Sequence, residues 1–227
     1  MNTPAIEKDV KDSKQPDTKQ KLLDTASELI WKNNYDTVGI AEICKNAGVT
    51  KGAFYHHFTS KADLFLTVCA SQCEDVTRKM DDMLSSRFTP LEQLENVMAH
   101  LLEKQCCDGV VEIRGCPLFT AGSQGSCEDQ GIRDTARDMS TLSINHYTRL
   151  VGNLAAGKYL NHIPDAEQTG RLIHQFIEGL WLHGRMHQDL EQLSIDLREG
   201  LYRVLDVKQR YRVSSAGHDT PKLASVR

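Results

Sequence analysis

Apolar residues recur with a helical period along almost the whole chain between residues 18 and 211. Near the N-terminus, Leu22, Leu23, Ala26, Leu29 and Ile30 are spaced i, i+1, i+4, i+7 and i+8, which places them on one face of a helix. Two asparagines follow this stripe, and Asn tolerates the left-handed conformation that ends many helices. The pattern predicts an amphipathic first helix that begins near residue 18.

The same periodicity predicts seven further helices and no strand. Their expected ranges are 40–46, 51–58, 61–83, 91–105, 130–154, 165–188 and 194–211. Residues 106–129, rich in Gly and Cys, are the least regular part, and no alternating pattern is long enough to indicate a strand. The predicted fold class is therefore all-α, with polar flexible tails at 1–17 and 212–227.

The charge distribution separates the first helices from the rest. The whole chain carries a formal net charge of -4, whereas residues 19–61 hold six lysines and four acidic residues. A mildly basic N-terminal segment on an acidic remainder suits a protein with one nucleic-acid-binding end. No apolar run is long enough to cross a membrane, and the N-terminus lacks the apolar core of a secretion signal. Seven cysteines without an export signal indicate free thiols and a cytoplasmic location.

Residues 43–58 have the features of a helix-turn-helix. Ala47 closes the first helix, Gly48 fits a turn too tight for a side chain, and Val49 fills the elbow. Phe54 and Phe58, four residues apart, give the following helix a buried face. Its polar N-terminal end is then free to enter the major groove of DNA.

The exposed positions of this second helix are the candidate DNA contacts. Thr50, Lys51, Ala53 and His56 are left for bases and backbone, and Tyr55 and His57 lie near the phosphate edge. The alternatives are a solvated helix face or a metal site formed by the two histidines. Adjacent histidines on a helix point apart, which disfavours joint ligation by this pair.

Residues 43–61 read ICKNAGVTKGAFYHHFTSK and resemble the DNA-binding segment of the TetR (tetracycline-repressor-like) family. The sequence departs from the family pattern at Cys44, which replaces Ala, and at Gly39, which replaces a Thr that can cap a helix and contact phosphate. The resemblance implies a helix-turn-helix domain over 18–64 and an effector-binding and dimerisation domain over 65–211. It also implies a set of DNA contacts, with Lys61 at a phosphate: Gly39, Thr50, Lys51, Gly52, Ala53, Tyr55, His56, His57 and Lys61.

The helices predicted after residue 65 suit a ligand pocket and a dimer. Apolar stripes along 172–181 and 190–205 are long enough for two helices from each subunit to form an intermolecular four-helix bundle. The resemblance assigns the dimer interface to these last two helices and an effector pocket to the middle ones. The alternative is that both stripes are ordinary core. The expected partners are therefore double-stranded operator DNA, a small-molecule effector and a second copy of the chain.

Residues 114–118 look like the Gly-Cys-x-Leu motif of a TetR subgroup, in which a cysteine such as Cys116 is thought to sense reactive compounds. Such chemistry needs an accessible thiol with a depressed pKa. A buried, unreactive cysteine beside a reversibly bound apolar ligand is the favoured alternative. The candidate effector-binding residues are Cys116, Leu118, Phe119, Cys127, Tyr147, His174 and Trp181.

No motif in the sequence indicates catalysis, a cofactor or a metal. The pairs Cys69/Cys73 and His183/His187 each share a helical face, but nothing completes a zinc site, so packing is preferred. A phosphate-binding loop, a nucleophile elbow and a metalloprotease motif are all missing from the sequence. We therefore expect a ligand-responsive repressor rather than the alternatives, a small helical thiol- or metal-dependent enzyme or a helical adaptor that binds another protein.

Overall fold

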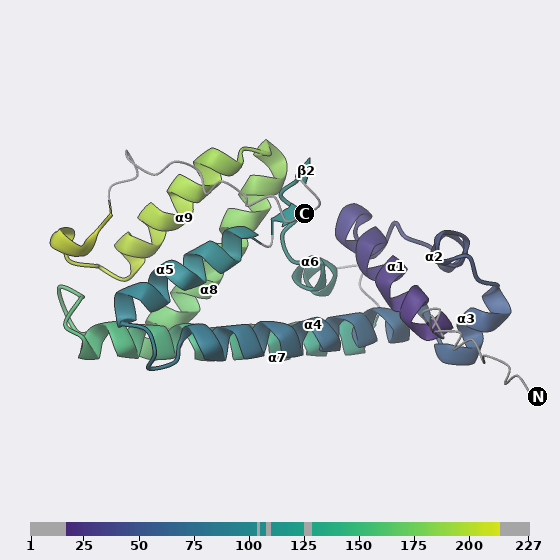
Figure 1. The fold of residues 1–227 in the computed structure, drawn as a ribbon, viewed down its shortest axis with the longest axis horizontal. Coiled ribbons are helices and arrows are strands. Elements are labelled where there is room, and N and C mark those ends of the chain that lie inside the picture. Colours follow the sequence, from purple (N-terminus) through teal and green to yellow (C-terminus); the bar gives the residue numbers. More distant parts are fainter. Residues whose placement is uncertain (1–16, 104, 108–109, 125–128, 214–227) are drawn as a thin grey trace, which may run out of the picture.

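The computed structural model describes residues 17–103, 105–107, 110–124 and 129–213. The described chain is almost entirely helical, as predicted, and contains one antiparallel pair of two-residue strands (Figure 1). The elements are α1 (Thr18–Asn33), α2 (Ile40–Ala47), α3 (Lys51–His57), α4 (Lys61–Met83), α5 (Pro90–Glu103), β1 (Cys106–Cys107), β2 (Val110–Val111), α6 (Pro117–Ser123), α7 (Gln130–Ala156), α8 (Ala166–His187), α9 (Leu190–Val204) and the 3-10 turn η1 (Gln209–Tyr211).

Helices α1, α2 and α3 and the start of α4 form a small unit at one end of the molecule, here called the head (residues 18–64) (Figure 1). Its core contains Leu22, Ile43, Phe54 and Leu64, none of which has any exposed surface. The periodic apolar stripe of α1 meets the buried faces of α2, α3 and α4 here. Burial of these side chains fixes the position of α3, because each large apolar side chain contributes about 1.5–3 kcal/mol.

The remaining helices form a larger unit, here called the body (residues 65–211). Helices α4 and α7 run side by side along it, and α5, α8 and α9 pack above them (Figure 1). Helix α4 is continuous from the head into the body, and Ser60 starts it by accepting a hydrogen bond from the backbone N–H of Asp63 at 3.0 Å. The expected domain boundary at residue 64 therefore falls inside a helix. No helix among the described residues meets the length and apolarity that a membrane crossing requires.

The predicted helix ends agree with the structure for α8 and differ from it for α9. Asp165 caps α8 and Asp189 caps α9, each by accepting from a backbone N–H at 2.9 Å. The expected start of the last helix at residue 194 is wrong, since the cap at Asp189 starts it at Leu190, and it ends at Val204 rather than 211. Helix α6, which begins with Pro117, lies in the stretch that was expected to be irregular.

The turn between α2 and α3 depends on Gly48. Its φ of 66° is in the left-handed region, and its N–H donates to the carbonyl groups of Cys44 and Lys45. This conformation ends α2 and turns the backbone toward the start of α3. A side chain at this position is disfavoured because its Cβ crowds the following carbonyl oxygen.

We expect Gly48→Ala to lower the free energy of unfolding by about 1–2 kcal/mol, because alanine is strained at positive φ. Gly152→Ala is the matched control, since Gly152 lies inside α7 with open space where a Cβ would stand. That variant gains about 0.5–1 kcal/mol through its better helix propensity. Chemical denaturation of both variants measures these changes. Equal effects of the two substitutions would contradict the role of the left-handed turn.

Candidate nucleic-acid interface and ligand cavity

The aromatic residues Phe54 and Phe58 pack α3 against the core of the head, and Thr50 caps the N-terminus of the helix. The Thr50 hydroxyl accepts a hydrogen bond from the backbone N–H of Ala53 at 3.1 Å. Phe54 and Phe58 are buried, with ring centroids 5.9 Å apart, and they anchor the helix on the head core. The opposite face of α3 is left on the surface.

That outer face carries most of the residues predicted to contact DNA. Thr50, Lys51, Gly52, Tyr55 and His56 are exposed, and Tyr55 has 57% of its surface accessible. The remaining two members of the set on this helix, Ala53 and His57, are half-buried. The structure therefore brings the predicted residues of α3 together on one short, rigid helix at the end of the molecule (Figure 1).

Gly39 stands at the start of α2, as predicted, and contributes only its backbone. The residue is exposed, and no side-chain cap closes this helix end. A Cβ at Gly39 would have no atom within 4 Å. The hydroxyl that the family pattern places here is thus missing, while the space for it is present.

Lys61 is placed differently from the prediction of a phosphate contact. Its ammonium group points into the head and donates to the backbone carbonyls of Tyr35 at 2.9 Å and Val38 at 3.2 Å. It also lies 4.1 Å from the centroid of the Tyr35 ring. Burial lowers the pKa of this amine, and the nearby Asp36 carboxylate opposes that shift. The α1–α2 connection leaves carbonyl groups that need a donor, and Lys61 supplies it. The phosphate contact of Lys61 stays a prediction.

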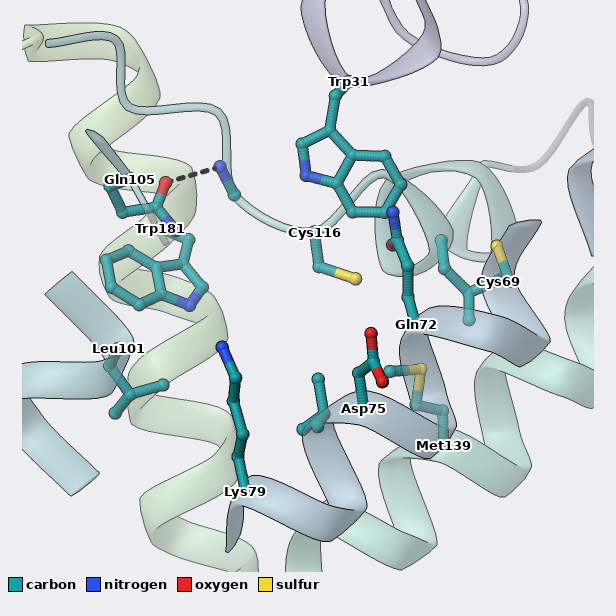
Figure 2. A pocket seen from close by; sticks show the side chains of 13 residues that line it. Trp31, Cys69, Gln72, Asp75, Lys79, Leu101, Gln105, Cys116, Met139 and Trp181 are labelled. Atoms are coloured by element: carbon teal, nitrogen blue, oxygen red, sulfur yellow. Dashed lines mark hydrogen bonds between the residues drawn. The ribbon is translucent and has the colours of Figure 1, made fainter. Parts of the chain in front are cut away.

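A cavity of about 340 Å³ lies between the head and the body. Trp31 reaches it from α1, Trp181 from α8, and Cys116 stands between the two indoles with its thiol pointing inward (Figure 2). Helix α4 forms the opposite wall with Gln72, Asp75 and other residues. The list of lining residues is Trp31, Cys69, Gln72, Asp75, Val76, Lys79, Leu101, Gln105, Gly115, Cys116, Leu118, Met139 and Trp181.

A second cavity, of about 590 Å³, lies among α6, α7 and α8 and shares Cys116 and Trp181 with the first. Its walls are strongly charged, with three arginines and Glu178. Burial raises the pKa of the Glu178 carboxyl to about 7. This cavity also borders Gly179 and Leu182, which are exposed on the outer face of α8.

The predicted effector-binding residues divide into three groups. Cys116, Leu118, Phe119 and Trp181 line one or both cavities. Tyr147 and His174 line neither of these two cavities and are buried behind them, where His174 Nε2 is 2.8 Å from the Ser140 hydroxyl and burial lowers the pKa of the imidazole. Cys127 lies outside the described residues.

The contacts that join the head to the body were not predicted. Arg185 on α8 donates to the side-chain oxygen of Asn34 in the head at 2.7 Å, and within the body it donates to the Thr120 hydroxyl at 3.1 Å. Gln72 on α4 donates to the Ser27 hydroxyl on α1 at 3.1 Å. These residues gave no signal in the sequence, because Arg185, Gln72 and Trp31 each fit the ordinary pattern of an amphipathic helix. Only the fold brings α1, α6 and α8 together.

The paired cysteines and histidines do not form a metal site in the described part of the chain. No group of three or more potential ligands is close enough there to hold a metal ion. Cys69 is buried, and its pKa is raised to about 12, mainly by desolvation and further by Cys116 and Cys73. The His183 and His187 rings lie 4.2 Å apart on an exposed part of α8.

Helix α8 carries an apolar stripe on its outer face. Leu172, Leu182 and Met186 are 48%, 62% and 68% exposed, and the small Gly179 lies between them. Their spacing along α8 places them on one side of the helix, opposite the buried Ile173 and Ile177. Exposed large apolar side chains on one helix face are a common feature of protein interfaces.

Comparison with known proteins agrees with this geometry. The profile described as "Bacterial regulatory proteins, tetR family" matches residues 22–68, which span the head and the start of the body. The HTH-type transcriptional regulator AcrR of Shigella flexneri is 34% identical over 189 residues, covering 79% of this chain and 85% of that protein.

Two solved structures illustrate the likeness in fold. A TetR-family transcriptional regulator from Agrobacterium tumefaciens superposes with a TM-score of 0.74 at 19% identity, over 82% of this chain and 96% of that one. FadR from Bacillus subtilis, in complex with stearoyl-CoA, gives a TM-score of 0.64 at 16% identity, over 82% and 97%. With a relative 34% identical over most of its length and a matching head, the chain belongs to the TetR family of bacterial regulatory proteins and is a DNA-binding transcription regulator.

Proposed function

We propose that this regulator is a homodimeric repressor that binds a palindromic operator and is released from it by a small-molecule effector. The observation that carries the proposal is the outer face of α3, where Thr50, Lys51, Tyr55 and His56 are exposed on a helix fixed by buried aromatic residues. A rigid helix with a polar N-terminal end fits the major groove, and its side chains meet base edges and phosphates. The family consists of transcriptional regulators, which favours this function over the enzyme alternative.

The outer stripe of α8 supports a dimer. Leu172, Leu182 and Met186 would pack against the same residues of a second copy in a self-complementary two-fold interface. Two heads presented in this way can reach half-sites about 34–36 Å apart, one turn of DNA. The proposed division of labour follows, with residues 18–64 binding DNA and residues 65–211 forming the dimer and the effector site.

The cavity between the head and the body supports ligand control. FadR, which shares the fold, was solved with stearoyl-CoA bound. A ligand shifts this protein away from the operator if it binds more tightly to the DNA-incompetent arrangement. Cys116 faces the cavity. That its thiol reacts covalently, and that the protein belongs to the Gly-Cys-x-Leu subgroup, stay predictions from the sequence.

Two substitutions on α3 distinguish a contact to a base from a contact to a phosphate. We expect Lys51→Gln to weaken operator binding by about 1–3 kcal/mol and to relax the preference at one base pair, because Lys51 is proposed to face bases. Tyr55→Phe removes one phosphate hydrogen bond and weakens all sequences alike. Fluorescence anisotropy with the operator and single-base variants of it measures both effects.

The control for this pair is Lys158→Gln, which removes the same charge from an exposed position after α7, at the far end of the body (Figure 1). It leaves the affinity unchanged. Operator binding that is insensitive to Lys51→Gln and Tyr55→Phe would contradict the proposed interface and favour the adaptor function.

Lys61→Met tests whether Lys61 stabilises the head or contacts DNA. We expect the variant to lose about 1–3 kcal/mol of folding stability, because two backbone carbonyls lose a charged donor. The slope of log affinity against log salt stays as in the parent protein, since no phosphate contact is removed. An unchanged stability together with a slope smaller by about one would instead make Lys61 a phosphate ligand.

Leu182→Asp tests the dimer. A carboxylate in the centre of an apolar interface leaves a desolvated charge on each subunit, so we expect monomers by analytical ultracentrifugation and loss of operator binding. Ala99→Asp introduces the same charge at an exposed position on α5 and leaves the dimer intact. A dimer that persists in Leu182→Asp would place the interface elsewhere.

A further inference from the structure

We propose that the 340 Å³ cavity binds a neutral, planar aromatic molecule that contacts the head through Trp31 and the body through Trp181. This inference rests on the proposed function, because it names the class of effector and the atoms that the effector touches. The cavity is preferred over the larger one for a structural reason. The larger cavity borders the α8 stripe assigned to the dimer, whereas the smaller one lies between α1, α4 and α8.

The two indoles determine the shape of the expected ligand. Trp31 and Trp181 approach Cys116 from two sides, and the space between them is bounded below by α4 (Figure 2). Aromatic rings prefer offset-stacked or edge-to-face contact with other aromatic rings, which adds to the simple burial of apolar surface. Met139 of α7 also lines the cavity and contributes a thioether, which contacts aromatic rings favourably. A flat ring system therefore gains more from these walls than a saturated one of the same size.

The charged and polar groups of the cavity favour a neutral ligand. Asp75 and Lys79 are the charged residues that line it, and their charges are opposite. The lining therefore has no net charge to hold an ionic ligand. The Gln105 side-chain oxygen accepts from the backbone N–H groups of Arg114 and Gly115, both at 3.1 Å, which fixes that amide at the cavity wall (Figure 2). The side-chain NH2 group of this amide can donate a hydrogen bond to one hydroxyl or carbonyl oxygen on the ligand.

The size of the cavity limits the ligand to a small molecule. A volume of about 340 Å³ lies at the lower end of the range for ligand pockets, which suits a system of two or three fused rings. A long acyl chain does not fit this description. The volume of the cavity, its aromatic side chains and the net charge of its lining together favour this one class of ligand.

Contact with the head gives such a ligand direct control of the DNA-binding helix. Trp31 belongs to α1, which packs against α2, α3 and α4. Gln72, another lining residue, donates to Ser27 on the same helix. A ligand held between Trp31 and Trp181 thus senses the distance between head and body. Its affinity differs between head positions, and that difference is the coupling free energy.

The sequence offers a direct test, because it contains only two tryptophans, and both line this cavity. Full-length protein labelled with 5-fluorotryptophan should give two fluorine resonances, which Trp31→Phe and Trp181→Phe assign. The probe is 2-naphthol, and its matched control is decahydro-2-naphthol, the saturated analogue with the same hydroxyl. We expect saturable shifts of both resonances with 2-naphthol, and Overhauser effects from its protons to both fluorines.

The saturated analogue should bind roughly tenfold more weakly, because it cannot form aromatic contacts with the two indoles. Equal affinity for the two probes would overturn the aromatic class. Overhauser effects at Trp181 alone would overturn contact with the head, and the lack of saturable shifts at either fluorine would overturn the site. None of these measurements involves DNA, so they fail independently of the operator-binding experiments that test the proposed function.

Discussion

The continuity of helix α4 is the constraint on which the rest of the structure depends. One end of this helix supplies Leu64 and Phe65 to the core of the head, and the other supplies Met80 to the core of the body. Because the helix is unbroken between them, a displacement of its body end is transmitted to the head as a tilt. The position of α3 is therefore set by groups that lie far from the DNA-binding surface.

The junction around α4 combines apolar packing with a few polar contacts. The apolar cluster of the head continues through Leu118 and Ala121 of α6 and Ile132 and Ala136 of α7. At its edge, Arg185 bonds to Asn34 and Gln72 bonds to Ser27. Each such bond contributes only about 0.5–1.5 kcal/mol. Such bonds can exchange at a small cost, whereas the shared apolar cluster keeps α1 and the start of α4 packed near α6 and α7. A movement of the head therefore requires a shift of packed helices together with the exchange of these hydrogen bonds.

The sequence predicted the features that depend on local signals. Helical periodicity and the turn at Ala47, Gly48 and Val49 predicted the helix-turn-helix, and the exposed side of α3 followed from Phe54 and Phe58. The inward direction of Lys61 could not be predicted, because the carbonyls it binds belong to another helix connection. The strands β1 and β2 and helix α6 could not be predicted either. The strands have two residues each, which is too short for a periodic pattern, and α6 is a single short helix.

The ligand cavity shows why tertiary placement, and not residue type, decides a site. Tyr147, His174 and Trp181 were equivalent candidates in the sequence, yet of these three only Trp181 lines the two cavities. His174 lies on the same side of α8 two turns earlier and packs against Phe119, whereas Trp181 lies beside Gly115. Trp31 was not singled out in the sequence, and it packs on the core of the head while lining the cavity between the two units. A side chain that packs in one core and also borders a second unit responds to the distance between them. Such residues, rather than the most reactive or most polar ones, are where ligand binding and DNA binding become energetically linked.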